Sequence, residues 1–357
     1  MKILLLGAGG FIGVNLTERL LRDGVHSVIA LDIQEEKISE VLAQTPDLDY
    51  RHLDISKDER EVDSLVADAD IVVDLVAFAN PSLYVEDPVG VFDLNFTQNM
   101  KVVEQCLRHR KHLVQFSTCE VYGITAAKAM GLDPRDLPIP FDEDETPLIM
   151  GPVKNQRWIY ACAKQLLERV LHGYGIRGDL TWTVIRPFNF IGPRIDYLPS
   201  ESGGGNPRVF SHFLNGLLYG TPIKLVDGGI NYRAYTYIDD AVDCMVRIFE
   251  AKDGAAKNQI YNIGTPENEV TIKEFAELTI EVFDEHFRED GDPNPEVVSV
   301  SGEEFYGPGY EDCDRRIPVV DKARALGWTS EHDIRSTIYH TMKYFVEKHR
   351  AKQAAQV

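Results

Sequence analysis

The chain has 357 residues, of which 44% are hydrophobic and 26% charged, so it can bury a substantial core without disulfides or metal ions. Its 57 acidic and 37 basic side chains give a net charge of −20, which argues against nucleic acid and anionic membranes as partners. Five cysteines without a CxxC pair indicate neither a disulfide framework nor a metal site. No apolar run approaches the roughly 20 residues that span a membrane. We therefore expect a cytoplasmic protein.

Short apolar runs alternate with amphipathic stretches through the first half of the chain. The runs predict strands at residues 2–6, 27–31, 50–53, 71–75, 113–116 and 181–186. Helices are predicted at 12–21, 88–109 and 157–174, and irregular loops at 123–156 and 192–206. This alternation indicates a parallel sheet covered on both faces. We therefore expect a doubly wound α/β Rossmann fold over residues 1–187. Residues 188–350 are expected to form mainly a smaller, mixed α/β substrate-binding domain, partly interleaved with the first.

A glycine-rich turn, GAGGFIG at residues 7–13, separates the first predicted strand from the first helix. Gly7 permits the tight turn, Gly10 lets the backbone approach a pyrophosphate, and Gly13 allows close packing of helix on strand. The helix that begins here offers unpaired N–H groups to phosphates. The turn therefore predicts a dinucleotide site formed by Gly7, Gly10, Phe11, Ile12 and Gly13.

Asp32 ends the second predicted strand, 19 residues after Gly13. A carboxylate there hydrogen-bonds the ribose hydroxyls of the adenosine and repels a 2′-phosphate, which favours NAD over NADP. The alternative is a surface turn residue. Asp54 and Ile55 follow the third strand and are expected to contact the adenine, although an aspartate at a strand end is often only a cap.

Tyr160 and Lys164 are four residues apart in a predicted helix, so their side chains share one face. An ammonium beside a phenol favours the phenolate, which would make Tyr160 a general base for oxidising an alcohol. Tyr344 and Lys348 have the same spacing near the end of the chain, without a glycine turn ahead of them. We interpret that second pair as part of a solvated helix.

The fifth predicted strand runs into Ser117, Thr118, Cys119 and Glu120. Ligands bind at the carboxyl ends of parallel strands, so Thr118 or Ser117 is expected to hold the reacting oxygen near Tyr160. Each hydroxyl by itself is more often a cap. Cys119 is equally consistent with a buried apolar residue and with a chemical role. Glu120 is predicted to be functional, because a carboxylate is rarely buried without a task.

An anionic substrate in so acidic a protein requires a local cluster of positive charge. Candidate arginines are Arg157, Arg186, Arg194, Arg208, Arg233, Arg315 and Arg316. Guanidinium groups suit phosphate and carboxylate, although most surface arginines are merely solvated. The last two follow an aromatic, glycine-rich run at 305–310, where an arginine is expected to hold a substrate carboxylate.

Taken together, these motifs resemble the UDP-glucuronic acid decarboxylases, which are extended short-chain dehydrogenases, over nearly the whole chain. The resemblance rests on GAGGFIG (7–13), FSTCEVYG (116–123), QRWIYACAK (156–164), RPFN (186–189), GPR (192–194), KLVDGG (224–229) and YGPGYEDCDRRIP (306–318). It implies NAD-dependent oxidation of the sugar at C4, loss of carbon dioxide through a UDP-4-keto intermediate, and reduction to a UDP-pentose, UDP-xylose and/or UDP-apiose. A homodimer formed through two helices per subunit is also implied.

The resemblance also implies roles for particular residues. Tyr160, assisted by Lys164, would take the proton from the C4 hydroxyl, and Thr118 would steady the 4-oxygen. Arg316 would hold the C6 carboxylate, Glu120 would handle protons at C5, and Cys119 would act as acid or base toward a ring hydroxyl. The residues implied to bind the UDP-sugar are Arg157, Asn189, Arg194, Lys224, Arg233, Tyr310 and Arg316.

Several alternatives stay open at this stage. Cys119 is more similar to the plant-type UDP-apiose/UDP-xylose synthases than to the decarboxylase of the lipid A aminoarabinose pathway, which would stop at the UDP-4-keto-pentose. Ala79 stands where the plant enzymes carry a cysteine, which weighs against ring contraction to apiose. A UDP-glucuronate 4-epimerase and a nucleotide-sugar dehydratase would use the same oxidation. A non-enzymatic NAD sensor need not keep Tyr160, Lys164 and Thr118 together.

Overall fold

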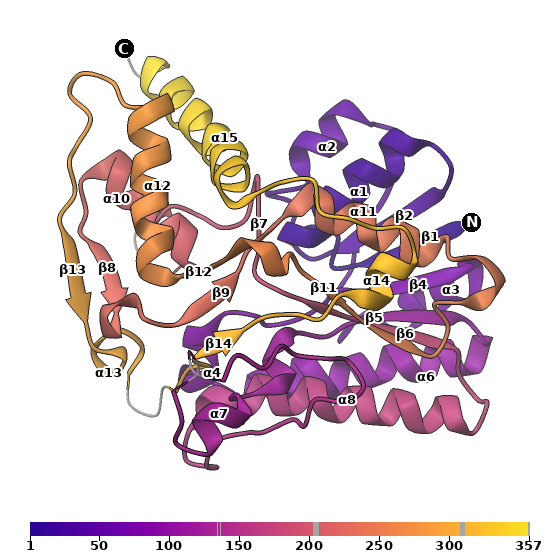
Figure 1. The fold of residues 1–357 in the computed structure, drawn as a ribbon. Coiled ribbons are helices and arrows are strands. Elements are labelled where there is room, and N and C mark those ends of the chain that lie inside the picture. The colour runs from indigo at the N-terminus through magenta and orange to yellow at the C-terminus, as the bar shows by residue number, and fades with distance from the viewer. Residues whose placement is uncertain (134, 136, 203–206, 308–310, 356–357) are drawn as a thin grey trace.

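Figure 1 shows the computed structural model, which describes residues 1–133, 135, 137–202, 207–307 and 311–355. Within these residues, seven strands form one parallel sheet in the order β11-β6-β5-β4-β1-β2-β3. The strands are β1 (Lys2–Leu6), β2 (Ser27–Asp32), β3 (Asp49–His52), β4 (Ile71–Asp74), β5 (His112–Phe116), β6 (Trp182–Pro187) and β11 (Gln259–Ile263). The predicted doubly wound Rossmann fold is therefore confirmed, and the six predicted strands all lie in this sheet.

Helices cover both faces of the sheet, which explains why its strands are apolar almost throughout (Figure 1). In β1, Ile3 and Leu5 pack into the core formed with α1 (Phe11–Asp23) and α11 (Ile238–Phe249). Leu4 and Leu6 pack into the opposite core, formed with α3 (Glu59–Asp68), α6 (Asn99–His109) and α8 (Ile159–Ile176). Because successive side chains of a strand point to opposite faces of the sheet, this strand contributes residues to both cores.

The prediction of one continuous helix at 88–109 was wrong, because the helix is interrupted in its interior. The structure has α5 (Pro88–Phe92), a π-helical turn η1 (Asp93–Gln98) and then α6. The side chain of Asn95 donates to the backbone oxygens of Val91 (2.8 Å) and Phe78 (3.2 Å) inside this turn. A π turn inserts a residue into the helical repeat, and π turns occur frequently at functional sites. The insertion sets the start of α6, where Asn99 lies.

Short elements occupy the two predicted loops. The first contains α7 (Ala126–Ala129) and ends in the 3-10 turn η3 (Gln156–Trp158), and the second contains α9 (Pro199–Ser202). Two short helices precede the π turn, α2 (Ser39–Gln44) and α4 (Pro81–Glu86). A third short helix, α14 (Asp321–Ala325), lies late in the chain. The remaining 3-10 turns are η2 (Cys119–Tyr122), η4 (Asp227–Gly229), η5 (Lys252–Gly254) and η6 (Pro266–Asn268).

The later part of the chain adds three small sheets and four helices beside the large sheet (Figure 1). Strand β8 (Ile223–Val226) pairs with β13 (Val297–Val300), and β7 (Phe190–Ile191) pairs with β10 (Thr236–Tyr237). Strand β9 (Tyr232–Ala234) lies between β12 (Glu269–Thr271) and β14 (Arg315–Arg316). The helices are α10 (Val209–Tyr219), α12 (Ile272–His286), α13 (Gly302–Tyr306) and α15 (Ile334–Ala354). Strand β11 and helix α11 return to the large sheet. Among the helices of the described residues, none has the length and apolar character to cross a membrane.

The glycine turn after β1 depends on the absence of side chains. Gly7 has a φ of +85°, and a Cβ built on Gly13 would lie 2.2 Å from the carbonyl oxygen of Gly7. Gly13→Ala therefore forces the turn away from α1, and we expect it to lower the free energy of unfolding by about 1–3 kcal/mol, as overpacked sites do. Urea denaturation measures the change.

Gly173→Ala is the matched control for that variant. Gly173 lies in α8, and a Cβ there would meet nothing within 4 Å. We expect it to leave stability unchanged or to raise it by up to about 1 kcal/mol, because alanine favours the helix. Equal stability of Gly13→Ala and Gly173→Ala would contradict the packing role of Gly13.

Candidate active site

Two cavities lie beyond the carboxyl end of the large sheet, where ligands bind in folds of this kind. The large cavity, of about 610 Å³, is lined mainly by residues of the later part of the chain, among them Lys224 and Arg233. The small cavity, of about 250 Å³, is lined by Phe11, Thr118 and Tyr160. Ala79, Glu120, Asn189, Arg208 and Arg316 line both. The shared walls place the glycine turn and the strand end on one side of the combined space and the later part of the chain on the other.

Tyr160 lies buried in the first turn of α8, and it lines the small cavity together with Thr118. The ring stacks on Tyr84 from α4, with centroids 4.9 Å apart and planes 15° apart. Burial raises the pKa of the Tyr160 phenol, and Glu120 and Cys119 act in the same direction, while Thr118 opposes them. The structure therefore brings together the hydroxyl and phenol that the sequence predicts, with the phenol oriented by packing.

Lys164 lies one turn further along α8, fully buried. Its ammonium donates to the side-chain oxygen of Asn99 at 3.0 Å. Burial lowers the pKa of Lys164 to about 8, against the opposing effect of Asp74 and Glu168. The sequence predicts that Lys164 assists Tyr160 and that both residues also bind the cofactor. The structure adds that an amide on α6 orients the ammonium.

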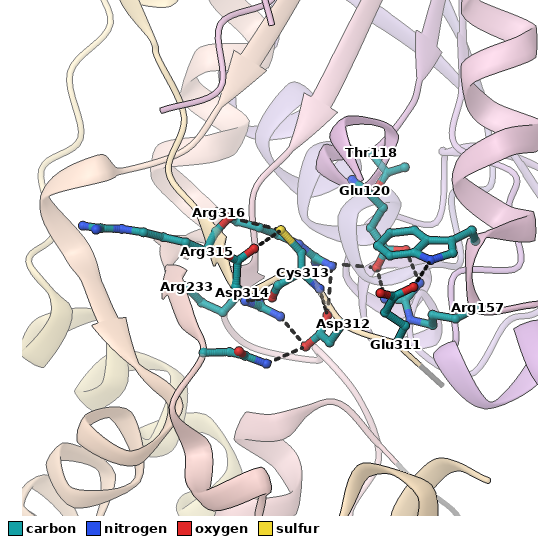
Figure 2. Close-up of polar contacts among 12 residues, drawn as sticks. Thr118, Glu120, Arg157, Arg233, Glu311, Asp312, Cys313, Asp314, Arg315 and Arg316 are labelled. Carbon is teal, nitrogen blue, oxygen red and sulfur yellow. Dashed lines mark hydrogen bonds and ion pairs between the residues drawn. The ribbon is translucent and has the colours of Figure 1, made fainter. Parts of the chain in front are cut away.

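Glu120 is paired with two arginines in the shared wall (Figure 2). Arg157 binds the carboxylate with both terminal nitrogens, at 2.5 and 2.7 Å, and Arg316 lies 3.6 Å from it. Burial would raise the pKa of Glu120, but Arg157 and Arg316 hold it below its ordinary value. The carboxylate is therefore ionised and fixed in position, with two positive charges beside it.

The segment that follows the aromatic run closes this wall. Asp312 is partly buried and pairs with both Arg233 and Arg316, and its pKa falls to about 2 because, against burial, Arg233 and Arg316 favour the carboxylate (Figure 2). Glu311 accepts from the indole N–H of Trp158 at 2.9 Å, next to Arg157. Asp312 thus holds two arginines from distant segments, while Glu311 fixes the indole of Trp158 beside them.

Cys119 is a buried free cysteine between Thr118 and Glu120. Burial raises the pKa of its thiol, although Arg316 opposes the effect. At neutral pH the side chain is therefore a thiol in the wall of the small cavity. It can serve as a proton donor there, but it is not a thiolate nucleophile.

The glycine turn fits a dinucleotide. Asp32 accepts from the backbone N–H of Gly9 at 2.8 Å and from that of Gln34 at 2.9 Å. A Cβ on Gly9 would lie 2.1 Å from the backbone oxygen of Gln34 and 3.0 Å from the Asp32 carboxyl carbon. Gly9, which the sequence reasoning did not single out, therefore keeps the turn against Asp32. Phe11 and Ile12 line the small cavity from the start of α1.

Some of the other predicted site residues line the cavities, and others do not. Asn189, Lys224, Arg233 and Arg157 line the large cavity as expected. Arg194 does not line either cavity, because Glu18 (2.7 Å) and Glu40 (3.3 Å) bind its guanidinium elsewhere.

The two residues predicted at the adenine also lie outside both cavities. Asp54 is hydrogen-bonded to Ser56 and ion-paired with Lys57, which lower its pKa to about 2 despite partial burial. The side chain of Ile55 is buried in the core. Tyr310 lies outside the described residues.

The remaining arginines of the predicted cluster divide by their partners. Arg186 is buried in a pair with Glu168 at 2.6 Å, and Arg315 pairs with Glu269 at 2.6 Å, so both serve the packing. Arg208 lines both cavities and lies over the ring of Phe11. The sequence showed Arg208 only as one arginine among seven.

Sequence reasoning also missed Asn99, Tyr84, Asp312 and Tyr235. Asn99 is 65 residues from the lysine it contacts, and no local pattern connects the two. Tyr84 and Tyr235 resemble ordinary core aromatics in the sequence. Asp312 lies four residues before Arg316 in the sequence. An acidic residue so close to the predicted arginine pair was the one sequence signal that could have identified it.

Comparisons with known proteins find relatives along nearly the whole chain. The model of the family described as the NAD dependent epimerase/dehydratase family matches residues 3–264. UDP-D-apiose/UDP-D-xylose synthase 1 of Arabidopsis thaliana is 39% identical over 96% of this chain and 91% of its own length.

Solved structures show the same fold. The PbgP3 protein from Burkholderia pseudomallei is 34% identical, with a TM-score of 0.81 over 98% of both chains. The UDP-glucuronic acid 4-epimerase of Bacillus cereus, in complex with UDP-glucuronic acid and NAD, is 20% identical. Its TM-score is 0.77 over 98% of this chain and 99% of its own, which shows the fold alone.

The position of Asp32 generates a prediction about the cofactor. Asp32→Ala removes the carboxylate at the end of β2, so we expect NAD to bind at least about tenfold more weakly, the loss of one or two charged hydrogen bonds. NADP should gain relative to NAD, because the repulsion of its 2′-phosphate is relieved. Isothermal titration with both dinucleotides measures the ratio.

Asp49→Ala on the neighbouring strand β3 is the control, since Asp49 pairs with Arg51 on the surface. It should leave both affinities unchanged. An unaltered preference for NAD in Asp32→Ala would show that another residue selects the cofactor.

Proposed function

Because the chain belongs to the NAD dependent epimerase/dehydratase family and so uses NAD, we propose that it decarboxylates UDP-glucuronic acid and reduces the product to a UDP-pentose. The observation that carries the proposal is the position of Arg316. Its guanidinium lines the small cavity together with Thr118 and Tyr160. An arginine that can bind a carboxylate therefore lies beside the groups that can oxidise an alcohol. The similarity to the plant synthase supports the same substrate.

The first step oxidises the C4 hydroxyl of the sugar. When bound, NAD supplies the acceptor for the hydride from C4 and later its donor. Tyr160 takes the hydroxyl proton, and Thr118, which lines the same small cavity, holds the 4-oxygen. Lys164, held by Asn99, lies one helical turn from Tyr160 on α8, and its positive charge would favour deprotonation of the phenol.

The second step releases carbon dioxide. A ketone at C4 lies β to the C6 carboxylate, so the electrons of the C5–C6 bond can move onto the 4-oxygen as that bond breaks. Arg316 would orient the carboxylate, and Glu120 and Asp312 hold this guanidinium in place. Glu120 is itself ionised, so it can accept a proton and relay it to C5. Tyr160 then returns its proton to the 4-oxygen as the ketone is reduced.

The pentose is UDP-xylose and/or UDP-apiose in this proposal. Ala79 lines both cavities, and the thiol of Cys119 lies in the wall of the small one. Cys119 supplies the only thiol among the described residues that line the two cavities, and this favours UDP-xylose as the product over UDP-apiose. A homodimer and a cytoplasmic location stay predictions, drawn from the resemblance and from the composition.

Proton NMR of the purified protein with UDP-glucuronic acid and NAD tests the function directly. We expect the anomeric signal of the substrate to be replaced by that of a UDP-pentose, with one carbon dioxide released per turnover. The UDP-4-keto-pentose as the end product would remove the reduction step from the proposal. UDP-galacturonic acid without carbon dioxide would make the protein a 4-epimerase instead, and unchanged substrate would exclude the assigned substrate.

Tyr160→Phe tests the general base. The variant keeps the stacked ring but loses the hydroxyl, so we expect kcat to fall by about 10²–10⁴-fold with NAD affinity nearly unchanged. The matched control is Tyr344→Phe, since Tyr344 and Lys348 share the same spacing on α15 and line neither cavity. It should keep full activity. A similar loss in both variants, or in neither, would contradict the role of Tyr160.

A further inference from the structure

Three polar atoms in the wall of the small cavity are buried without a hydrogen-bond partner in the part of the chain that the structure describes. They are the hydroxyl of Ser117, the Nε of Arg316 and the hydroxyl of Tyr235. A buried polar atom that lacks a partner costs free energy, and such atoms in native proteins call for an explanation. Ser117 and Arg316 adjoin the reacting groups already described. Tyr235 has no part in that chemistry.

The position of the Tyr235 hydroxyl is determined by packing. The residue lies between β9 and β10, and its side chain is 2% exposed. Its ring stacks on Phe275 from α12, with centroids 3.9 Å apart and planes 13° apart. Its backbone exchanges hydrogen bonds with Asn268. The ring therefore cannot swing to find another partner, and the residue stays in the lining of the small cavity.

The surroundings of this hydroxyl suit an oxygen-rich, anionic ligand. Arg208 and Arg316 line the same cavity, and Arg233 and Asp312 interact electrostatically with the phenol. Guanidinium groups carry no acceptor, so they cannot satisfy a hydroxyl proton. An anionic oxygen placed between them can accept from the arginines and from Tyr235 together.

Tyr235 belongs to the side of the cavity that is formed by the later part of the chain. Tyr235 directly follows β9, which carries Arg233 into the large cavity and pairs with β14, the strand of Arg316. The glycine turn and Tyr160 come from the large-sheet side. A ligand group that reaches Tyr235 therefore belongs to the molecule held by Arg233 and Arg316.

We propose that the Tyr235 hydroxyl is a substrate-binding group that donates a hydrogen bond to an oxygen of the bound sugar nucleotide, on its diphosphate or its sugar. This inference rests on the proposed function for the identity of the ligand. It adds a binding residue that neither the sequence motifs nor the catalytic chemistry required.

The test compares Tyr235→Phe with Tyr219→Phe. The Tyr219 hydroxyl has partners, Glu201 at 2.9 Å and His349 at 3.0 Å, and it lines neither cavity. We expect Tyr235→Phe to weaken the binding of UDP-glucuronic acid roughly tenfold, with an unchanged or higher melting temperature, because it deletes an unpartnered group. Tyr219→Phe should do the reverse, with a lower melting temperature and unchanged affinity.

Titrations with UDP, UDP-glucuronic acid and NAD separate the outcomes. Weaker binding of both uridine nucleotides assigns the bond to the diphosphate, and weaker binding of UDP-glucuronic acid alone assigns it to the sugar; both support the proposal. Unchanged affinities, a loss for NAD alone, or a lower melting temperature with unchanged affinities would overturn it. Wild-type protein that binds neither uridine nucleotide would overturn the proposed function as well, whereas tight wild-type binding matched by Tyr235→Phe would overturn this inference only.

Discussion

The buried pairing of Glu120 with Arg157 and Arg316 joins three segments that are far apart in the chain. Glu120 follows strand β5 of the large sheet, Arg157 precedes α8, and Arg316 lies in β14 of the later part. Removing one partner of a buried pair leaves an uncompensated charge and costs about 3–5 kcal/mol. The pairing therefore requires the three segments to meet, and their meeting forms the wall that both cavities share. The helix that carries Tyr160 and Lys164 begins within this arrangement.

The same pairing resolves the electrostatic difficulty of an acidic protein that takes an anionic substrate. The chain has a net charge of −20, yet Arg157, Arg208, Arg233 and Arg316 gather around the cavities. Glu120 and Asp312 hold three of these arginines in place without covering them, since the arginines still line the cavity walls. Fixed charges of this kind bind an incoming carboxylate or phosphate without reorganising, which is what a decarboxylation through a charged intermediate needs.

Local sequence determined much of the fold and half of the site. Apolar strands that are buried on both faces, glycine turns and helical spacing are properties of a few neighbouring residues. The Rossmann sheet, the turn at Gly7, the carboxylate of Asp32 and the position of Tyr160 and Lys164 on one helix were therefore predictable. The second Tyr-Lys pair, Tyr344 and Lys348, shows the limit of spacing by itself. Only its context, a surface helix without a strand end nearby, separates it from the first pair.

Tertiary structure decided which side chains meet across long separations. Arg194 and Arg208 are equivalent in the sequence, yet Glu18 and Glu40 hold the first away from the cavities, while the second lines both. Asn99 reaches Lys164 from a helix whose start depends on a π turn, which periodicity does not reveal. The unpartnered hydroxyl of Tyr235 exists only because Phe275 and Asn268 hold the residue at the cavity wall. The composition and motifs of the chain thus determined its architecture and the kind of chemistry. The packing register decided the partners of each charged group, because that register depends on contacts that no short segment encodes.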